Sequence, residues 1–246
     1  MKNSYMVASM KLLPVVALCF GLSAHAQEKM GGSSLLTVAD KVQLASWLSE
    51  GPIALTKVYS KVQGDTSRNF HLAADGKGRT FSVMRASNEL GQSWLVGGYN
   101  PQSWSTAERY NMTLESNQRT AFIFNLTDGS MHRQTPKTYA LDTVGAYQTY
   151  NGAAFGPTFG LGYDLSVPEN LTTGGHSSLY SYIDPVTGGF GESVLDGSLN
   201  NASNVTYGAI EVFTISLVPE PGAAGMMVAG LGLLSSVIFR NRKLPA

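Results

Sequence analysis

Apolar positions in the middle of the chain follow the two-residue period of β-strands. In residues 79–85 apolar and polar side chains alternate, which puts Phe81 and Val83 on one face of a strand. Residues 120–126 contain a short continuous apolar run, as expected for a strand buried on both faces, and Asp128-Gly129 then turns the chain. Further strands are expected at 94–96, 138–142, 146–150, 164–167, 179–183 and 209–217.

Turn residues separate these segments at fairly regular spacing, which favours a sandwich over a βαβ fold. Apolar residues recur at the spacing of a helix only in the segment that precedes these strands. Residues 38–49 are predicted to form an amphipathic helix that begins with the capping-box pair Thr37 and Asp40 and is stopped by Gly51-Pro52. A second, shorter helical or turn-like piece is expected over 53–62. The predicted fold class is therefore mostly β (α+β), a two-sheet antiparallel β-sandwich with small flanking helices.

The first 26 residues have the pattern of a signal peptide. Lys2 and Lys11 precede an apolar run over 12–22, and Ala24 and Ala26 form a small-x-small cleavage site. The run is shorter than the roughly 20 residues that a membrane-spanning helix needs. Signal peptidase is therefore expected to cut after Ala26, and residues 27–34 to form a flexible linker.

The single cysteine, Cys19, lies inside that apolar run. Lipid attachment at Cys19 is the rival interpretation, but bulky Leu18 stands where a lipoprotein signal needs a small residue. Removal of the signal peptide leaves a chain with no thiol. It then has no disulfide, no thiolate nucleophile and no cysteine-ligated metal site.

The C-terminal segment 218–246 has three parts in order. Pro219-Glu220-Pro221 comes first, an uncharged apolar stretch over 223–239 follows, and Arg240 and Arg242 come next. The stretch reaches the short end of the membrane-spanning range, so one C-terminal transmembrane helix is expected. The cations after it predict that this end stays cytoplasmic and that the preceding domain lies outside. The two prolines keep the backbone before the helix extended and open to a protease.

This tail resembles the PEP-CTERM sorting signal of Gram-negative bacteria. The resemblance implies processing by an exosortase, with an inner-membrane-anchored intermediate. It also implies delivery to the cell surface or to an extracellular polysaccharide matrix. An ordinary tail anchor that is never cut is the alternative.

Six short motifs between the two ends occur in the order of a known family. They are Phe70-His71 with Asp75-Gly76-Lys77-Gly78 and Thr80-Phe81; Gly97-Gly98-Tyr99; Trp104; Ala121 to Leu126; Gly156 to Gly160 with Asp164-Leu165; and Ile210 to Phe213. Over residues 35–217 the chain resembles the TLDc domain. The resemblance implies a two-sheet antiparallel sandwich with small flanking helices. The partners of eukaryotic relatives do not carry over to an exported bacterial protein. A polar insertion at 184–205 departs from the family and leaves the strand pairing there open.

The net charge of the chain is 0, but the charges are unevenly placed. Five of the 17 cations lie outside residues 27–222, which leaves 12 cations against 17 acids there and a net charge of −5. An acidic domain is a poor match for nucleic acid or for an anionic lipid surface, because both are bound mainly through Lys and Arg. No nucleic-acid partner is expected.

The sequence holds no recognisable catalytic motif, and no metal site or cofactor is expected. His71, His132 and His176 are far apart, and His71 is expected on a half-buried strand. The Gly76-Lys77-Gly78 segment is predicted to be a tight turn rather than a phosphate-binding loop. Asp164 and Glu211 stand at strand ends, and two carboxylates of this kind are what a glycan-processing enzyme needs.

Exposed aromatic side chains are the other candidate for chemistry. Tyr99 and Trp104, with Trp94, Tyr147 and Tyr150, are candidates for a sugar-stacking platform, although aromatic residues of a sandwich more often lie in its core. Two functions remain. The favoured one is a non-enzymatic surface or matrix protein that binds extracellular polysaccharide or an envelope protein, or has a structural role. The alternative is a secreted glycan-processing enzyme that uses carboxylates of the sandwich.

Overall fold

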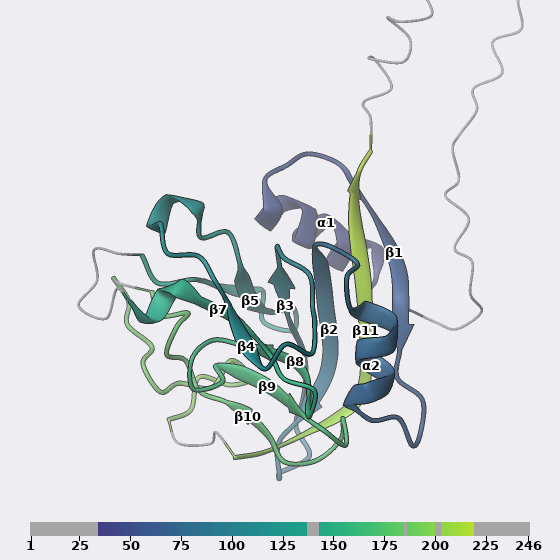
Figure 1. The fold of residues 1–246 in the computed structure, drawn as a ribbon. Coiled ribbons are helices and arrows are strands. Elements are labelled where there is room, and N and C mark those ends of the chain that lie inside the picture. The colour runs from purple at the N-terminus through teal and green to yellow at the C-terminus, as the bar shows by residue number, and fades with distance from the viewer. Residues whose placement is uncertain (1–33, 137–142, 185, 200–202, 219–246) are drawn as a thin grey trace, which may run out of the picture. The chain divides into compact units, whose positions relative to one another are not determined.

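The computed structural model describes residues 34–136, 143–184, 186–199 and 203–218, which form a mostly β domain (Figure 1). All pairings between its strands are antiparallel. The helical elements are α1 (Val38–Leu48), α2 (Ser67–Ala74) and two short 3-10 turns, η1 (Ser116–Gln118) and η2 (Val144–Ala146). The strands are β1 (Ile53–Ser60), β2 (Thr80–Ser87), β3 (Ser93–Asn100), β4 (Arg109–Met112), β5 (Phe122–Asn125), β6 (Ser130–Arg133), β7 (Tyr147–Asn151), β8 (Phe155–Phe159), β9 (Leu165–Pro168), β10 (Gly175–Ser177) and β11 (Ser203–Leu217). The predicted β-rich, antiparallel class with few helices is confirmed.

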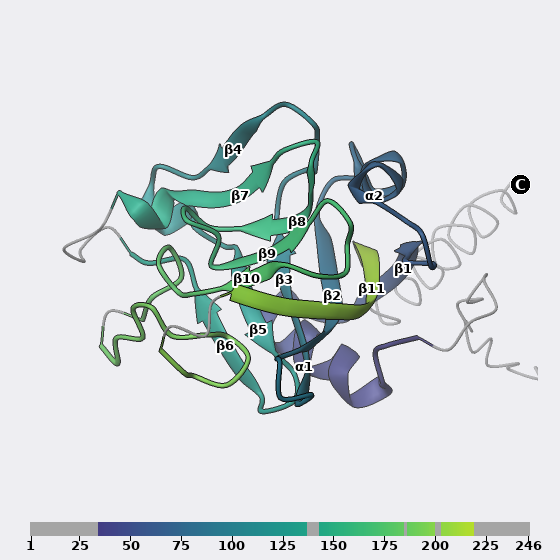
Figure 2. The same ribbon diagram turned by 90° about the horizontal axis from the view of Figure 1, so that it is seen from below.

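Strand β11 joins two halves of one eleven-stranded sheet (Figure 2). In the first half the order is β1-β11-β2-β3-β5-β6, and in the second it is β4-β7-β8-β9-β10-β11. The register of β11 against β2 shifts between Tyr207 and Ala209, so Gly208 forms a bulge. A bulge bends its strand. The strand therefore serves both halves, and the sheet folds over on itself.

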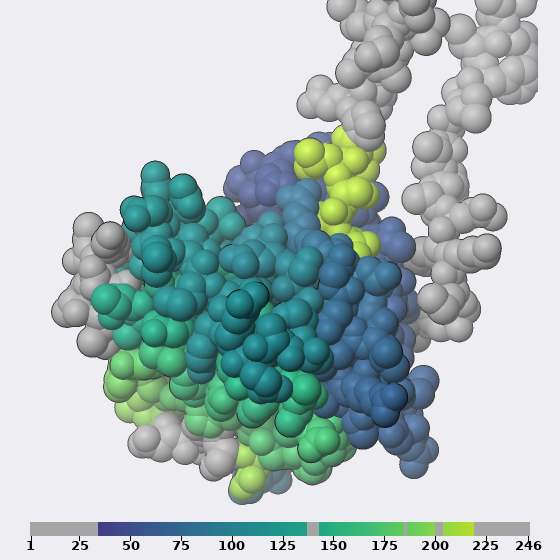
Figure 3. Space-filling model, in the orientation of Figure 1, coloured from purple at the N-terminus to yellow at the C-terminus, as the bar shows by residue number. Residues whose placement is uncertain are grey.

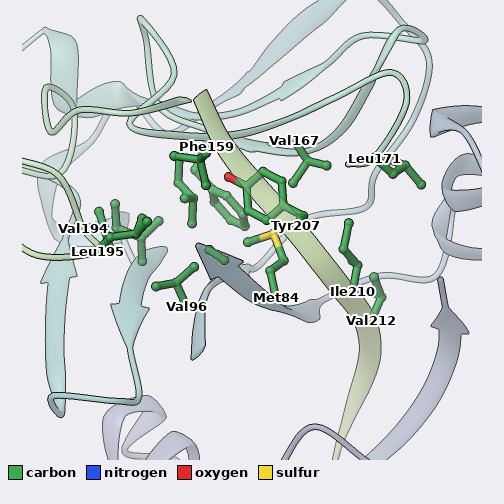
Figure 4. Close-up of a cluster of buried hydrophobic side chains, with 14 of the residues drawn as sticks. Met84, Val96, Phe159, Val167, Leu171, Val194, Leu195, Tyr207, Ile210 and Val212 are labelled. Carbon is green, nitrogen blue, oxygen red and sulfur yellow. The ribbon is translucent and has the colours of Figure 1, made fainter. Parts of the chain in front are cut away.

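The two halves pack against each other through one hydrophobic core (Figure 4). Met84 and Val96 come from the first half, whereas Phe159 and Val167 come from the second. Tyr207, at the bend of β11, lies among them and donates its hydroxyl hydrogen to the carbonyl oxygen of Ser166 at 2.9 Å. The large apolar side chains are fully buried here, and such burial is the main stabilising contribution to a fold without disulfides.

Helix α1 covers the other face of the first half. It begins at the predicted capping box, in which the Asp40 N–H donates to Thr37 Oγ1 at 3.2 Å and the Thr37 N–H donates to Asp40 Oδ2 at 2.8 Å. Trp47 of this helix packs on Phe124, with ring centroids 5.8 Å apart. Phe124 therefore faces α1, while its neighbour Ile123 faces the core between the halves. This arrangement explains why strand β5 is buried on both faces, as its continuous apolar run predicts.

Two local predictions are wrong. Residues 53–62 were expected to be helical or turn-like but include β1, because pairing with β11 along its whole length favours the extended form of this β-branched segment. Residues 179–183 were expected to form a strand but form a loop, whose backbone N–H groups bond a buried carboxylate instead of a neighbouring strand.

Other predictions meet the structure only in part. Within 184–199 the described residues form turns with two isolated bridges. The expected strand at 138–142, the signal peptide and the membrane stretch 223–239 lie outside the described residues. Within the part of the chain that is described, no helix is long and apolar enough to cross a membrane.

Candidate ligand-binding surface

Asp164 is fully buried in the turn before β9. Its Oδ2 accepts three backbone N–H groups, from Tyr180 at 2.6 Å, Ser181 at 2.8 Å and Tyr182 at 3.0 Å. Desolvation by burial raises the pKa of Asp164 to about 7, against the opposing effect of these hydrogen bonds. The carboxyl group thus acts as the internal anchor of the 179–183 loop.

Glu211 is 3% exposed and lies on the α1-facing side of β11. It forms an ion pair with Lys57 Nζ at 2.7 Å and accepts the Leu35 N–H at 2.8 Å, so it fastens the start of the domain to the sheet. The neighbouring Val212 points the other way, into the core between the halves. Glu211 and Asp164 share no partner, and neither opens to solvent. The structure therefore does not assemble the carboxylate pair that a glycan-processing enzyme needs.

Tyr99 and Trp104 are core residues. They are 3% and 1% exposed, respectively, and Trp104 Nε1 donates to Thr80 Oγ1 at 2.9 Å. Tyr99 packs on Phe81 and Phe122 beneath α1. Neither ring has a free face, so the sugar-stacking platform expected at these two positions does not form.

Ser67 and His71 of helix α2 and Asp75, the residue that caps the C-terminus of this helix, follow at intervals of four residues, an arrangement that suggests a catalytic triad. His71 Nδ1 lies 2.8 Å from Asp75 Oδ1. However, its Nε2 faces two backbone oxygens, of Gly152 at 3.1 Å and of Phe155 at 3.0 Å, and the Ser67 hydroxyl donates to the carbonyl oxygen of Ala153 at 2.7 Å.

These contacts hold α2 against the β7–β8 turn, and both Ser67 and His71 are buried. Figure 3 shows the blue part of the chain, which includes α2, next to green segments on the outer surface of the domain. The group is structural rather than catalytic, because the serine hydroxyl is directed at a carbonyl and not at the imidazole. His71 lies on a helix and not on a strand, so the prediction for its element is wrong.

In the Gly76-Lys77-Gly78 segment, the backbone N–H groups of both glycines already donate hydrogen bonds within the domain and are not free to bind a phosphate. The Gly76 N–H donates to the carbonyl oxygen of Trp104 at 3.1 Å, and the Gly78 N–H donates to Ser103 Oγ at 3.0 Å. Both glycines have positive φ angles, 68° and 77°, as a tight turn requires. Among the residues with described positions, no group of three or more His, Cys, Asp or Glu side chains lies close enough to hold a metal ion.

The surface that remains is aromatic. Five half-buried rings form a continuous chain of contacts along β4, β7, β8 and the turn after β8. Tyr110 contacts Tyr147 and Tyr150 with centroids 5.0 and 4.9 Å apart, Tyr150 contacts Phe155 at 5.4 Å, and Phe155 contacts Tyr163 at 5.2 Å. We call these five residues the tyrosine face. It is the largest set of contacting aromatic rings in the described residues that keeps partial exposure.

Two hydroxyl groups of the tyrosine face, those of Tyr110 and Tyr150, have pKa values raised above the ordinary value of tyrosine. Burial, and then the neighbouring tyrosines, raise the pKa of Tyr110 to about 12. The pKa of the Tyr150 hydroxyl is also raised, mainly by its hydrogen bond to Glu108 Oε2 at 3.1 Å. Glu108 is itself held by the Ala153 N–H at 2.7 Å. The face therefore combines apolar ring area with hydroxyl groups, which suits a ligand that has both C–H surfaces and hydroxyls.

Sequence reasoning found Tyr147 and Tyr150 but missed Tyr110, Phe155 and Tyr163. Tyr110 lies directly opposite Tyr150 in the β4–β7 pairing. This register was not predicted, because β4 is a short edge strand without a strong alternating pattern. No local signal in the sequence pointed to these three rings.

A comparison with protein families matches residues 217–243 to the PEP-CTERM protein-sorting motif. The match covers Pro219-Glu220-Pro221, the apolar stretch after it, and Arg240 and Arg242. No curated protein shows significant similarity to the chain. The sorting motif identifies the chain as an exported bacterial protein that is processed by an exosortase and sorted to the cell surface or the exterior.

Proposed function

We propose that this chain is a non-enzymatic surface or matrix protein whose TLDc-like domain binds extracellular polysaccharide through the tyrosine face. The observation that carries the proposal is the continuous set of half-exposed rings on a domain that is sorted outside the cell. Sugar rings have C–H faces that pack on aromatic rings, and hydroxyl groups that bond to tyrosine hydroxyls. The TLDc resemblance over 35–217 remains a prediction from the sequence motifs alone.

The route to the surface is part of the same proposal. Signal peptidase recognises Ala24 and Ala26 and releases a mature chain that starts at Gln27. The stretch 223–239 then holds the intermediate in the inner membrane of a Gram-negative cell, with Arg240 and Arg242 on the cytoplasmic side. Exosortase acts at the Pro219-Glu220-Pro221 segment. Sequencing the N-terminus of the envelope-associated protein tests the first step, and a retained Met1 contradicts it.

Binding is tested with processed protein from the producing cells and the insoluble polysaccharide that the same cells release. The wild-type protein is expected to sediment with the polymer. Tyr110→Ala and Tyr163→Ala each remove one ring of the tyrosine face and are expected to weaken binding by about tenfold.

Phe190→Ala is the matched control, because Phe190 is an exposed aromatic residue outside the face. It is expected to leave binding unchanged. Failure of the wild-type protein to sediment, or equal losses in all three variants, overturns the proposed function.

A further inference from the structure

A polar hollow of about 520 Å³ lies where the end of β4 meets η1 and β7. Its polar lining is almost entirely neutral: Gln102, Thr113, Gln118, Thr120 and Gln148. Glu115 is the one charged side chain that lines it. No basic side chain of the described residues does so, and this disfavours an anionic ligand.

The floor of the hollow is a fixed amide network. Gln148 is fully buried, and its Nε2 donates to Asn100 Oδ1 at 2.8 Å. Its Oε1 accepts Thr113 Oγ1 at 3.1 Å and Gln102 Nε2 at 3.4 Å. The orientation of the Gln148 amide is therefore set by three neighbours, which makes it a preorganised group rather than an adaptable one.

Behind the floor lies an unsatisfied donor. Asn100 is fully buried, and its Oδ1 also accepts the Gln102 N–H at 3.0 Å. Its Nδ2 has no hydrogen-bond partner within the described structure. Buried polar groups rarely lack a partner, because each one costs about 1–3 kcal/mol.

The rim has unused hydrogen-bonding capacity. The exposed side chains of Gln118 and Thr120 make no hydrogen bond with any described residue, whereas nearby Arg119 is engaged with the carbonyl oxygen of Thr113 at 3.1 Å. Amide and hydroxyl groups each donate and accept, as do the hydroxyls of a sugar. The chemistry of the hollow thus matches a neutral carbohydrate unit.

The hollow lies next to the tyrosine face, and one strand pair connects them. Met112, which is 41% exposed and lines the hollow, pairs with Tyr147 across β4 and β7. Tyr147 in turn contacts Tyr110 at the end of the ring series. A polymer that lies along the rings can therefore place one of its units in the hollow.

We propose that this hollow is a subsite for one neutral sugar unit of the bound polysaccharide, whose hydroxyls bond to the exposed side chains of Gln102 and Gln118, while the buried Gln148 holds Gln102 in place. The subsite rests on the proposed function, because it deepens the ligand class of the same surface. The rings supply contact area, and the glutamines supply selectivity for neutral over acidic sugars.

The test uses processed protein and two soluble probes of equal length, a neutral β-glucan hexasaccharide and a polygalacturonate hexasaccharide. Binding is measured by calorimetry. The neutral probe is expected to bind about tenfold more tightly than the acidic one. Gln102→Ala and Gln118→Ala are expected to weaken neutral binding by about tenfold each, with unchanged thermal melts, since both side chains are exposed. Gln43→Ala, an exposed glutamine of α1, is the matched control and is expected to have no effect.

The outcomes separate the two proposals. Loss of binding in the tyrosine-face variants with full binding in Gln102→Ala and Gln118→Ala overturns the subsite and leaves the proposed function standing. Equal or tighter binding of the acidic probe overturns the neutral-sugar assignment. Absence of binding to either probe by a protein that still sediments with the matrix polymer also overturns the subsite. Absence of binding to the polymer as well overturns both.

Discussion

Gly98 lies against the ring of Phe159, so that a Cβ added at Gly98 would lie 2.5 Å from the Cζ of that ring. Gly98 belongs to β3 and Phe159 to β8, and the contact therefore joins the two halves of the sheet. Gly98→Ala is expected to lower the free energy of unfolding by about 1–3 kcal/mol, because one extra methyl group forces the ring out of a packed core. Chemical denaturation measures the loss.

Gly208→Ala provides the matched control for this substitution. A Cβ at Gly208 meets only the carbonyl oxygen of Arg85, at an ordinary distance of 4.0 Å. Gly208→Ala is therefore expected to change the free energy of unfolding only slightly. Equal destabilisation of both variants would mean that the close approach at Phe159 is not the cause.

The stability of the domain is expected to depend on the ionisation of Asp164. Burial raises the pKa of this carboxyl from 3.8 to about 7 in the folded state. The folded protein therefore holds the proton more tightly, and the stabilising contribution of this group is complete below pH 4 and is lost as the pH rises through 7. Between these limits the free energy of unfolding should fall by up to about 1.4 kcal/mol per pH unit.

Asp164→Asn isolates this effect, because the amide cannot ionise but still offers an oxygen to the loop N–H groups. Melting curves from pH 4 to pH 7 are compared for the two proteins. The difference in melting temperature between the wild type and Asp164→Asn should change steadily with pH. A difference that stays constant from pH 4 to pH 7 would rule out a raised pKa of Asp164.

The doubly buried strand β5 makes a simple packing prediction. Phe124 is fully buried between α1 and the sheet, and it contacts Trp47 and Phe81. Phe124→Ala should cost about 3–5 kcal/mol of unfolding free energy. Phe190→Ala, at an exposed position, should cost little. A thermal melt of Phe124→Ala equal to that of the wild type would contradict the position of this ring.

The mature domain is expected to have no hydrolytic activity. Asp164 and Glu211 are buried among separate sets of partners, and the Ser67 hydroxyl is directed at a carbonyl oxygen. Incubation with the matrix polysaccharide should release no new reducing ends. Release that persists in preparations of the wild-type protein but disappears in Asp164→Asn or Glu211→Gln would establish the enzyme instead.

Processing of the tail should depend on the end of β11. The sorting motif starts at Leu217, which still pairs with Ile53 of β1, and the Val218 N–H donates to the carbonyl oxygen of Pro52 at 3.0 Å. Residues 219–222 span at most about 14 Å before the predicted membrane stretch. A Gly-Ser spacer inserted between Val218 and Pro219 should therefore speed conversion to the processed form, as followed by pulse-chase and gel mobility.

A strain that lacks the exosortase provides the comparison. There, both the wild-type chain and the spacer variant should accumulate at full length. Equal processing rates with and without the spacer in the normal strain would show that the folded end of β11 does not limit access.

Local patterns predicted the elements that carry their own signal. The continuous run at 120–126 gave β5 with burial on both faces, and Thr37 with Asp40 gave the start of α1. Helix α2 was missed because its capping pair, Thr66 and Asn69, is an unusual form of the capping box.

The candidate surface depended on contacts between distant segments, which a single sequence does not reveal. Tyr110 meets Tyr150 only through the register of β4 and β7, and Trp104 is core only because Phe70 and Phe159 close around it. The burial of Asp164 likewise depends on the 179–183 loop, which folds over its carboxylate. The chemistry of each side chain was readable, whereas its exposure was not.

Strand β11 also decides how the domain bears mechanical load. A force applied through the tail enters at Leu217 and runs along the strand, while the hydrogen bonds to β1 and β2 lie across it on both sides. These bonds therefore resist in shear, all at once, rather than opening one after another. Past the bulge at Gly208 the same strand continues into the second half and passes the load on to β10. The strand next to the sorting motif is thus the one best placed to hold a tethered protein folded while its surroundings pull on it.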